Sequence, residues 1–235
     1  METMVWSGQQ ERKPVQRVYH FISACYGLDD LRNRHLKIAQ IDELNDPFEL
    51  WTFAQPDHFS RQVSIAFKEE MALRHGLLCF SLDWHNPLLW SHYADKHRGI
   101  ALGFDVDEEM LWPVSYVKSR LNPERLYTEV AQENMNIEVD YRLLFSKYID
   151  WQYESETRVY TTLKDRNPDG FYFYDFSEQI VLREVIAGPH CMCTERELRA
   201  ATGPTTVVKF AKARLAFNSF RVVTDSDDES AVAAD

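Results

Sequence analysis

Two carboxylates and a guanidinium occupy every second position of one short segment, as Glu154, Glu156 and Arg158. The residues 157–163 are rich in β-branched and aromatic side chains and predict a β-strand. Because side chains alternate across a strand, the three charged groups are expected on one face. In a cavity such carboxylates could stabilise an oxocarbenium-like centre, whereas on an open face they would be solvated charges. Two like charges on one face also predict that at least one glutamate has a raised pKa.

An imidazole and a hydroxyl stand in the first predicted strand of the chain. His20 alternates there with aromatic side chains, and Ser23 closes the segment. A lone histidine on a strand more often packs in a core than takes part in chemistry, so this signal is weak by itself. A second aromatic-rich string, W-S-H-Y, places His92 and Tyr93 on a short predicted helix. The helix face shared by Trp90 and Tyr93 is more typical of a core than of a cofactor site.

The string N-D-P-F-E, at residues 45–49, predicts the start of a helix. Asp46 can cap it, Pro47 suits the first helical position, and Glu49 stands three residues after the cap, as in a capping box. The segment is therefore assigned a structural role.

No metal site is expected from the spacing of potential ligands. His92 and His97 are five residues apart, whereas helical ligands work best at i and i+4. Cys191 and Cys193 form a lone C-x-C with only His190 adjacent, and the four cysteines of the chain fit reduced thiols. Neither common glycine-rich phosphate loop is present, which disfavours Rossmann or P-loop nucleotide binding.

Composition and charge exclude several classes of protein. The chain has 235 residues, 45% of them hydrophobic, and a net charge of −11. The last eleven residues hold five of the acids and no base, so the rest of the chain carries −6. This balance argues against broad non-specific binding of nucleic acid but leaves a local basic cleft open. No apolar run approaches a membrane span, and residues 1–13 are too polar for a signal peptide, so a cytoplasmic protein without membrane association is expected.

The order of the predicted elements favours an α+β fold over a doubly wound α/β sheet. Strands are predicted at 16–23, 36–40, 77–81, 99–104, 157–163, 171–176, 181–187, 205–210 and 220–223, and helices at 26–35, 58–75, 87–96, 123–150 and 194–203. The last of these helices begins with a capping box at 194–197. Residues 1–15 are predicted to form a polar arm, 16–223 a single α+β domain, and 224–235 an acidic disordered tail.

Four strings taken together resemble a known family. They are the aromatic-rich first strand, N-D-P-F-E, F-S followed by W-S-H-Y-A-D-K-H-R-G-I-A-L-G-F, and W-Q-Y-E-S-E-T-R. In this order they resemble the bacterial domain-of-unknown-function family twenty-nine seventy-one, from about Val18 to Gly188. That family carries no settled activity to transfer to this chain.

A weaker resemblance connects the chain to the ADP-ribosyltransferase superfamily, in particular its DNA-targeting toxins and the RNA phosphotransferases. Tyr19-His20-x-x-Ser23 is similar to the first motif of that superfamily, and Glu154-x-Glu156 to its last motif. Tyr93, or alternatively Trp90, is similar to its nicotinamide-side aromatic residue. The chain departs from the pattern in lacking the usual S-T-S string. The resemblance implies an α+β fold with a split, mixed or antiparallel sheet and flanking helices.

The same resemblance implies NAD as substrate and a role for each matching residue. His20 would hydrogen-bond the ribose, Tyr93 would stack on nicotinamide, and Glu156 would stabilise the oxocarbenium ion. Glu154 would position the acceptor, and Arg158 would hold the carboxylates or contact a phosphate. Ser23 and His92 complete the expected cofactor-binding set.

The expected function is therefore an NAD-dependent ADP-ribosyltransferase-like enzyme that modifies an intracellular nucleic acid or protein, as a toxin, effector or antiviral-type modifier. Two alternatives stay open. The acidic strand and aromatic cleft could engage a partner without chemistry, or His92 or His97 could act with Glu154 or Glu156 in a hydrolase or nuclease.

Overall fold

A computed structural model describes residues 13–49, 53–121, 145–204 and 207–226 of the chain. The first described strand begins at Val15, and the last ends at Thr224. Most of the predicted N-terminal arm and of the predicted acidic tail lies outside the described residues, as does the predicted helix at 123–150 up to residue 144. Among the described residues, no helix is long and apolar enough to cross a membrane.

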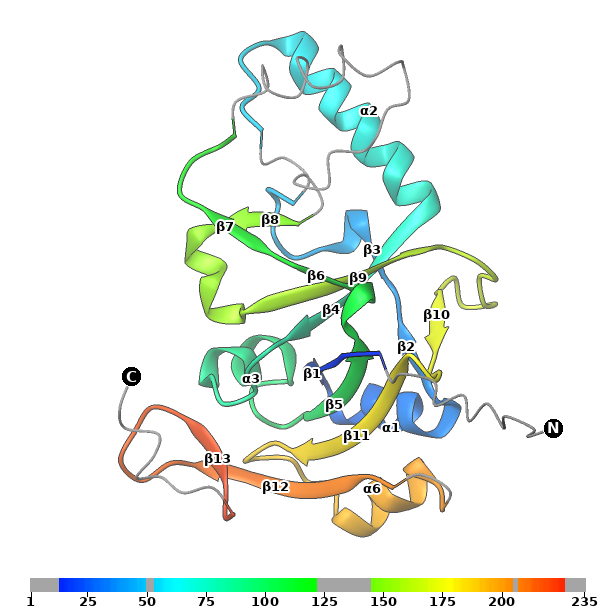
Figure 1. The fold of residues 1–235 in the computed structure, drawn as a ribbon, viewed down its shortest axis with the longest axis vertical. Helices are drawn as coiled ribbons and strands as arrows, with labels where there is room; N and C mark the ends of the chain where they lie inside the picture. Colours follow the sequence, from blue (N-terminus) through cyan, green and yellow to red (C-terminus); the bar gives the residue numbers. More distant parts are fainter. Residues whose placement is uncertain (1–12, 50–52, 122–144, 205–206, 227–235) are drawn as a thin grey trace, which may run out of the picture.

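A curled sheet forms the centre of the molecule, with helices on its flanks (Figure 1). In the described part of the chain its strands follow the order β13-β12-β11-β5-β1-β4-β9-β6, and β3 pairs with β4. The only parallel pair among these strands is β11 with β12, so the sheet is mixed. The bounds are β1 Val15–Ile22, β3 Ala39–Gln40, β4 His75–Ser81, β5 Ile100–Asp107, β6 Leu111–Pro113, β9 Glu156–Thr162, β11 Ile180–Ala187, β12 Lys209–Leu215 and β13 Val222–Thr224.

Two short strand pairs complete the strands that the structure describes. They are β2 (His35–Lys37) with β10 (Phe173–Asp175), which run antiparallel, and β7 (Ser115–Val117) with β8 (Ser146–Tyr148), which run parallel. Where the helix predicted at 123–150 enters the described residues, the chain forms β8 and then a 3₁₀ helix. The end of that prediction is therefore wrong.

Side-chain caps mark the starts of three of the four α-helices that the structure describes. The α-helices are α1 Ala24–Asn33, α2 His58–Arg74, α3 Pro87–Tyr93 and α6 Glu195–Thr202, and the 3₁₀ helices are η1 Ile41–Glu43, η2 Glu108–Met110 and η3 Ile149–Glu154. The side chain of Asn86 accepts from the backbone of Leu88 and precedes a proline at the first helical position of α3. The capping box at Thr194 and Glu197 is present at α6, which confirms that prediction.

The sheet divides between β1 and β4. Strand β1 pairs with β5 over its full length, from Val15 opposite Asp107 to Ile22 opposite Ile100. With β4, however, it pairs only where Tyr19 lies opposite Ser81. Strand β4 ends at Ser81, and its other residues form no ladder pairs with β1, which leaves room for a cavity between the two strands.

The two faces of the sheet are packed differently. One face carries an apolar core of leucine, isoleucine, valine and phenylalanine side chains that includes residues of α1 and α6. The other carries an aromatic cluster around Trp90 of α3, which is fully buried. In Figure 1, α2 lies at one end of the long axis, and β12 with α6 lies at the other. The prediction of an α+β fold with a mixed sheet and flanking helices is confirmed.

Candidate functional site

A cavity of about 250 Å³ lies where β1 and β4 part. Residues 19–21 of β1 and 79–81 of β4 line it, together with α3, β8, β9 and the segment 43–49. Phenyl and aliphatic side chains form part of the wall, and six charged side chains, of which Glu43 stands apart from the other five, form another part. The cavity therefore combines apolar surface with concentrated charge, as ligand sites do.

The strand registers bring the polar residues of this wall to one face of the sheet. Arg158 of β9 lies opposite Cys79 of β4, and Glu156 lies opposite Ser81. Ser81 in turn lies opposite Tyr19 of β1. Residues directly opposite each other in a ladder point to the same face. Alternation along β9 then puts Glu156 and Arg158 on this face, as the sequence predicted.

Glu154 reaches the same cavity by a different route from the one predicted. It is the last residue of the 3₁₀ helix η3, and Ser155 follows in the left-handed region (φ 43°, ψ 50°), so the strand begins only at Glu156. The Ser81 hydroxyl donates to the backbone carbonyl of Glu154 (2.6 Å) and fixes this turn. The expectation of one continuous strand face is thus wrong for Glu154, although all three charged residues line one cavity.

Arg158 is fully buried and bridges two carboxylates. Its Nη1 and Nη2 donate to Glu49 (3.1 and 2.7 Å), while its Nε and Nη2 donate to Glu156 (2.8 and 2.9 Å). Bidentate contacts of this kind set the orientation of both carboxylates as well as neutralising charge.

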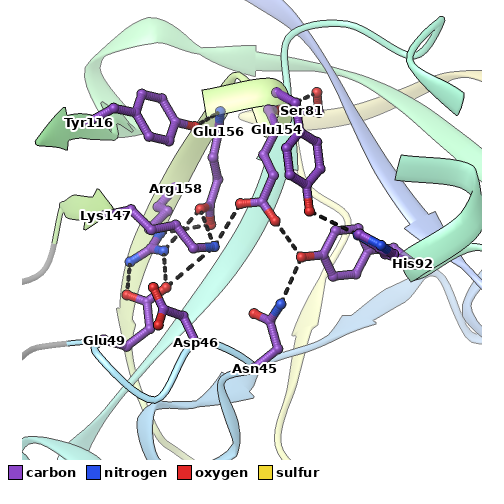
Figure 2. A network of polar contacts seen from close by, with 12 residues as sticks. Asn45, Asp46, Glu49, Ser81, His92, Tyr116, Lys147, Glu154, Glu156 and Arg158 are labelled. Atoms are coloured by element: carbon purple, nitrogen blue, oxygen red, sulfur yellow. Dashed lines mark hydrogen bonds and ion pairs between the residues drawn. The ribbon is translucent and has the colours of Figure 1, made fainter. Parts of the chain in front are cut away.

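Lys147 of β8 lies among three carboxylates, as Figure 2 shows. Its Nζ is 2.6 Å from Glu154, 3.2 Å from Glu156 and 3.4 Å from Glu49. Lys147 is 4% exposed, so these contacts are shielded from solvent. Three carboxylates against Lys147 and Arg158 leave this buried cluster, the ion cluster below, with a formal charge of −1.

The two glutamates of the motif have pKa values shifted in opposite directions. Burial opposes ionisation of Glu156, but the adjacent Arg158 and Lys147 outweigh it and lower its pKa to about 2. Burial raises the pKa of Glu154 despite its contact with Lys147, and repulsion by Glu156 adds to this. The raised pKa of one glutamate was predicted from their repulsion, whereas burial is its main cause. Two carboxyls separated in this way can act differently, one as a fixed charge and one as a proton acceptor or donor.

Tyr93 connects the ion cluster to the aromatic wall. Its hydroxyl donates to Glu154 and accepts from Asn45 Nδ2 (2.8 Å). Burial and the charge of Glu154 both raise the pKa of Tyr93, so the phenol keeps its proton near neutral pH. The ring stands on α3, which confirms a helical position for this aromatic residue.

His20 lies in the gap between the diverging strands. Its Nδ1 is 3.0 Å from the carbonyl oxygen of Cys79 on β4. A carbonyl only accepts, so Nδ1 carries the proton and Nε2 keeps its lone pair. Among the described residues, no side chain or backbone group hydrogen-bonds Nε2. Burial lowers the pKa of His20, which is therefore neutral at pH 7.

The structure brings together five of the seven predicted site residues. His20, Tyr93, Glu154, Glu156 and Arg158 all line the cavity.

Ser23 and His92 do not line it. Ser23 follows β1 at the N-terminus of α1, where its hydroxyl is 3.4 Å from the thiol of Cys25. His92 Nδ1 contacts the hydroxyl of Tyr153 (2.8 Å) at an exposed position on α3.

Three residues of the site were missed at the sequence level. The segment 45–49 forms a turn rather than a helix start, with Asp46 accepting from the backbone of Phe48 (2.9 Å). Glu49 and Asn45, assigned there a structural role, instead line the cavity. Lys147 lies in no motif. The one available signal was indirect, because two buried glutamates beside a single arginine require a second cation.

Comparison with known proteins shows that residues 89–159 are similar to a family described as protein of unknown function (DUF2971). The match confirms the predicted resemblance to this family for the segment that contains the W-S-H-Y and W-Q-Y-E-S-E-T-R strings. The aromatic-rich first strand and N-D-P-F-E, on which the resemblance also drew, lie outside the matched residues. This DUF2971 segment, well under half of the chain, carries Tyr93, Lys147 and the E-S-E-T-R string of the cavity. No curated protein and no solved structure matches the chain.

Proposed function

We propose that the cavity binds the nicotinamide–ribose half of NAD and that the protein cleaves its N-glycosidic bond, as an ADP-ribosyltransferase-like enzyme. One observation carries this proposal. His20 of β1, Tyr93 of α3 and Glu156 of β9, assigned to one site by their resemblance to superfamily motifs, line the same cavity. Residues so far apart in sequence share a cavity only if the fold brings their elements together.

The size and charge of the cavity fit this part of the dinucleotide. About 250 Å³ is enough for a ring and a sugar but too small for a whole dinucleotide, whose adenosine would lie outside. The formal charge of −1 on the ion cluster favours a cationic ring over a neutral one. It favours still more the positive charge that develops on the ribose as the bond breaks.

Each residue has a place in the chemistry. The C1′–N bond breaks, and its electron pair returns to the ring nitrogen, which becomes neutral. Glu156, ionised and held by Arg158, stabilises the ribosyl cation. A new bond then forms between C1′ and an oxygen or nitrogen of the acceptor, and Glu154 takes the proton that the acceptor loses. His20 Nε2 accepts a hydrogen bond from a ribose hydroxyl, and the Tyr93 ring packs against nicotinamide.

A non-catalytic binding module is the second candidate. Both oxygens of Glu156 already contact Arg158, an arrangement also typical of a structural ion pair. In that case the cavity would bind a ligand and leave it unchanged.

Nicotinamide release and transfer of label from NAD test the proposal, with lysate as the source of acceptor. Glu156→Gln is expected to abolish nicotinamide release, because the transition state loses its stabilising charge. Glu154→Gln is expected to reduce transfer more than simple hydrolysis, and His20→Ala to weaken binding of NAD.

Glu109→Gln is the matched control, because Glu109 is exposed, pairs with Lys13 and does not line the cavity. Near-ultraviolet circular dichroism shows whether each variant is folded. Binding of NAD without turnover would favour the binding module. If the wild-type protein neither binds nor consumes NAD, the proposed function is wrong.

A further inference from the structure

A second group of polar residues lies away from the cavity, where α1 ends and β2 begins. Asp29 and Asp30 belong to the last turns of α1. The chain reverses at Arg34, which is left-handed (φ 56°, ψ 47°) and donates its backbone N–H to the carbonyl of Asp30. His35 then opens β2, and its imidazole returns to the two aspartates. One side-chain ligand atom from each of the three lies within 4.8 Å of the others. None of these residues lines the cavity.

The buried atoms of this group lack hydrogen bonds. Asp30 is 3% exposed, and its Oδ2 has no hydrogen-bond partner among the described residues. The Nε2 of His35 is also buried, and it too has no hydrogen-bond partner among the described residues. It is 3.5 Å from Asp29 Oδ2 and 3.7 Å from Asp30 Oδ1, distances too long for a good hydrogen bond. Buried polar atoms are rarely left in this state, because the lost hydration is not replaced.

We propose that Asp29, Asp30 and His35 bind a divalent cation, with Zn²⁺ as the best fit. Zinc binds imidazole nitrogen and carboxylate oxygen at about 2.0–2.2 Å, so two ligands of a tetrahedral ion lie about 3.3–3.5 Å apart. The separations of 3.5 and 3.7 Å from His35 Nε2 are close to that spacing. Two adjacent ligand atoms of an octahedral Mg²⁺ ion, with bonds of about 2.1 Å, lie roughly 3.0 Å apart. The separations from His35 fit this spacing less well. Two carboxylates also neutralise the charge of the ion.

Neighbouring residues hold the ligands in place. Asn33 Nδ2 donates to Asp29 Oδ1 (3.0 Å), which leaves Oδ2 directed at His35. The imidazole stacks on Phe173 of β10, with ring centroids 4.0 Å apart and planes 16° from parallel. Supporting contacts of this kind orient metal ligands.

The burial of Asp30, whose Oδ2 has no hydrogen-bond partner among the described residues, agrees with a bound cation. A metal at this position would connect the end of α1 to the β2–β10 pair, and its role would be structural rather than catalytic.

Metal titration of the full-length protein, first stripped with a chelator, tests the proposal with Zn²⁺ and Co²⁺ as probes. Zn²⁺ at a hundredfold excess over its Kd is expected to raise the melting temperature by about 5–10 °C. Co²⁺ is expected to give the visible absorption of a tetrahedral N/O site. Absence of both signals overturns the proposal.

Variants locate the bound metal. Asp30→Asn and His35→Gln are each expected to lose the melting-temperature shift and the cobalt spectrum. Without metal, Asp30→Asn should be at least as stable as the wild type, because it removes a poorly compensated buried carboxyl; this separates loss of binding from loss of folding. The double variant Cys191→Ser and Cys193→Ser should keep both signals. If the signals persist in Asp30→Asn and His35→Gln, or vanish in the cysteine variant, the metal binds elsewhere and the proposal is wrong.

Discussion

Replacing Glu156 by glutamine is expected to lower the stability of the folded protein by about 3 kcal/mol at neutral pH. Glutamine has the size of glutamate but lacks the charge that Arg158 contacts at 2.8 and 2.9 Å and Lys147 at 3.2 Å. Arg158 keeps Glu49 as a partner. The ion cluster is therefore weaker in the variant, but the guanidinium still contacts one carboxylate.

The magnitude follows from the pKa of Glu156, which is about 2 in the folded protein against an ordinary value of 4.5. Each pKa unit corresponds to about 1.4 kcal/mol, so the folded state favours the charged form over the neutral form by about 3 kcal/mol. Because the folded pKa is depressed, this contribution is complete above pH 4.5 and is lost as the pH falls from 4.5 towards 2. The difference between wild type and variant should therefore shrink to about 2 kcal/mol near pH 3.5.

Urea unfolding followed by tryptophan fluorescence measures both effects, at pH 7, 4.5 and 3.5. Glu109→Gln is the control, and its unfolding midpoint should stay close to that of the wild type because Glu109 and Lys13 are largely exposed. Equal stability of wild type and Glu156→Gln at pH 7 would refute the reasoning. So would a difference that stays constant between pH 7 and pH 3.5, because it would come from packing rather than charge.

Four further outcomes can be measured. Trp90→Ala should cost about 3–5 kcal/mol in urea unfolding, because the ring is fully buried and its N–H donates to the carbonyl of Trp84; a cost below about 1 kcal/mol would contradict this. Lys147→Met should cost about 3–5 kcal/mol, and adding Glu154→Gln should recover part of the loss, whereas simple additivity in the double-mutant cycle would show that the two residues are not coupled. Thr194→Ala should cost about 1 kcal/mol through loss of the capping box, and an unchanged unfolding free energy would indicate that this helix end contributes nothing. In an NMR titration His20 should show the Nδ1–H tautomer and a pKa below 6.5, and a higher value would contradict the burial argument.

Most elements were predictable from the sequence because their signals are local. The strands at 157–163 and 181–187 follow from β-branched and apolar residues, and the start of α6 follows from its capping box. Local patterns carry no signal for the division of the sheet. It arises because β1 and β4, which are far apart in sequence, pair only at Tyr19 and Ser81. The split was anticipated only through resemblance to another superfamily.

The site was predictable only where strand alternation applies. Glu156 and Arg158 share a face because both belong to β9, and period-2 spacing requires it. Glu154 reaches the cavity only because Ser155 is left-handed, a conformation that no residue type in the string demands. Glu49 and Lys147 contribute through long-range ion pairs, and a local capping signal concealed the first of them.

Stability alone does not explain the ion cluster. Apolar side chains of the same volume would stabilise the fold at least as well as five buried ionic groups, because ions lose their hydration on burial. The proposed function, in which the cavity would present fixed charge to a ligand, does explain it. Arg158 holds Glu156 through two donors, so the carboxylate is already oriented and would not need to reorganise during the proposed reaction. Lys147 contacts all three carboxylates yet cannot neutralise them completely, and a formal charge of −1 remains beside an apolar wall. A ligand that brings a positive charge into this cavity completes the balance, which a neutral ligand of the same shape cannot do.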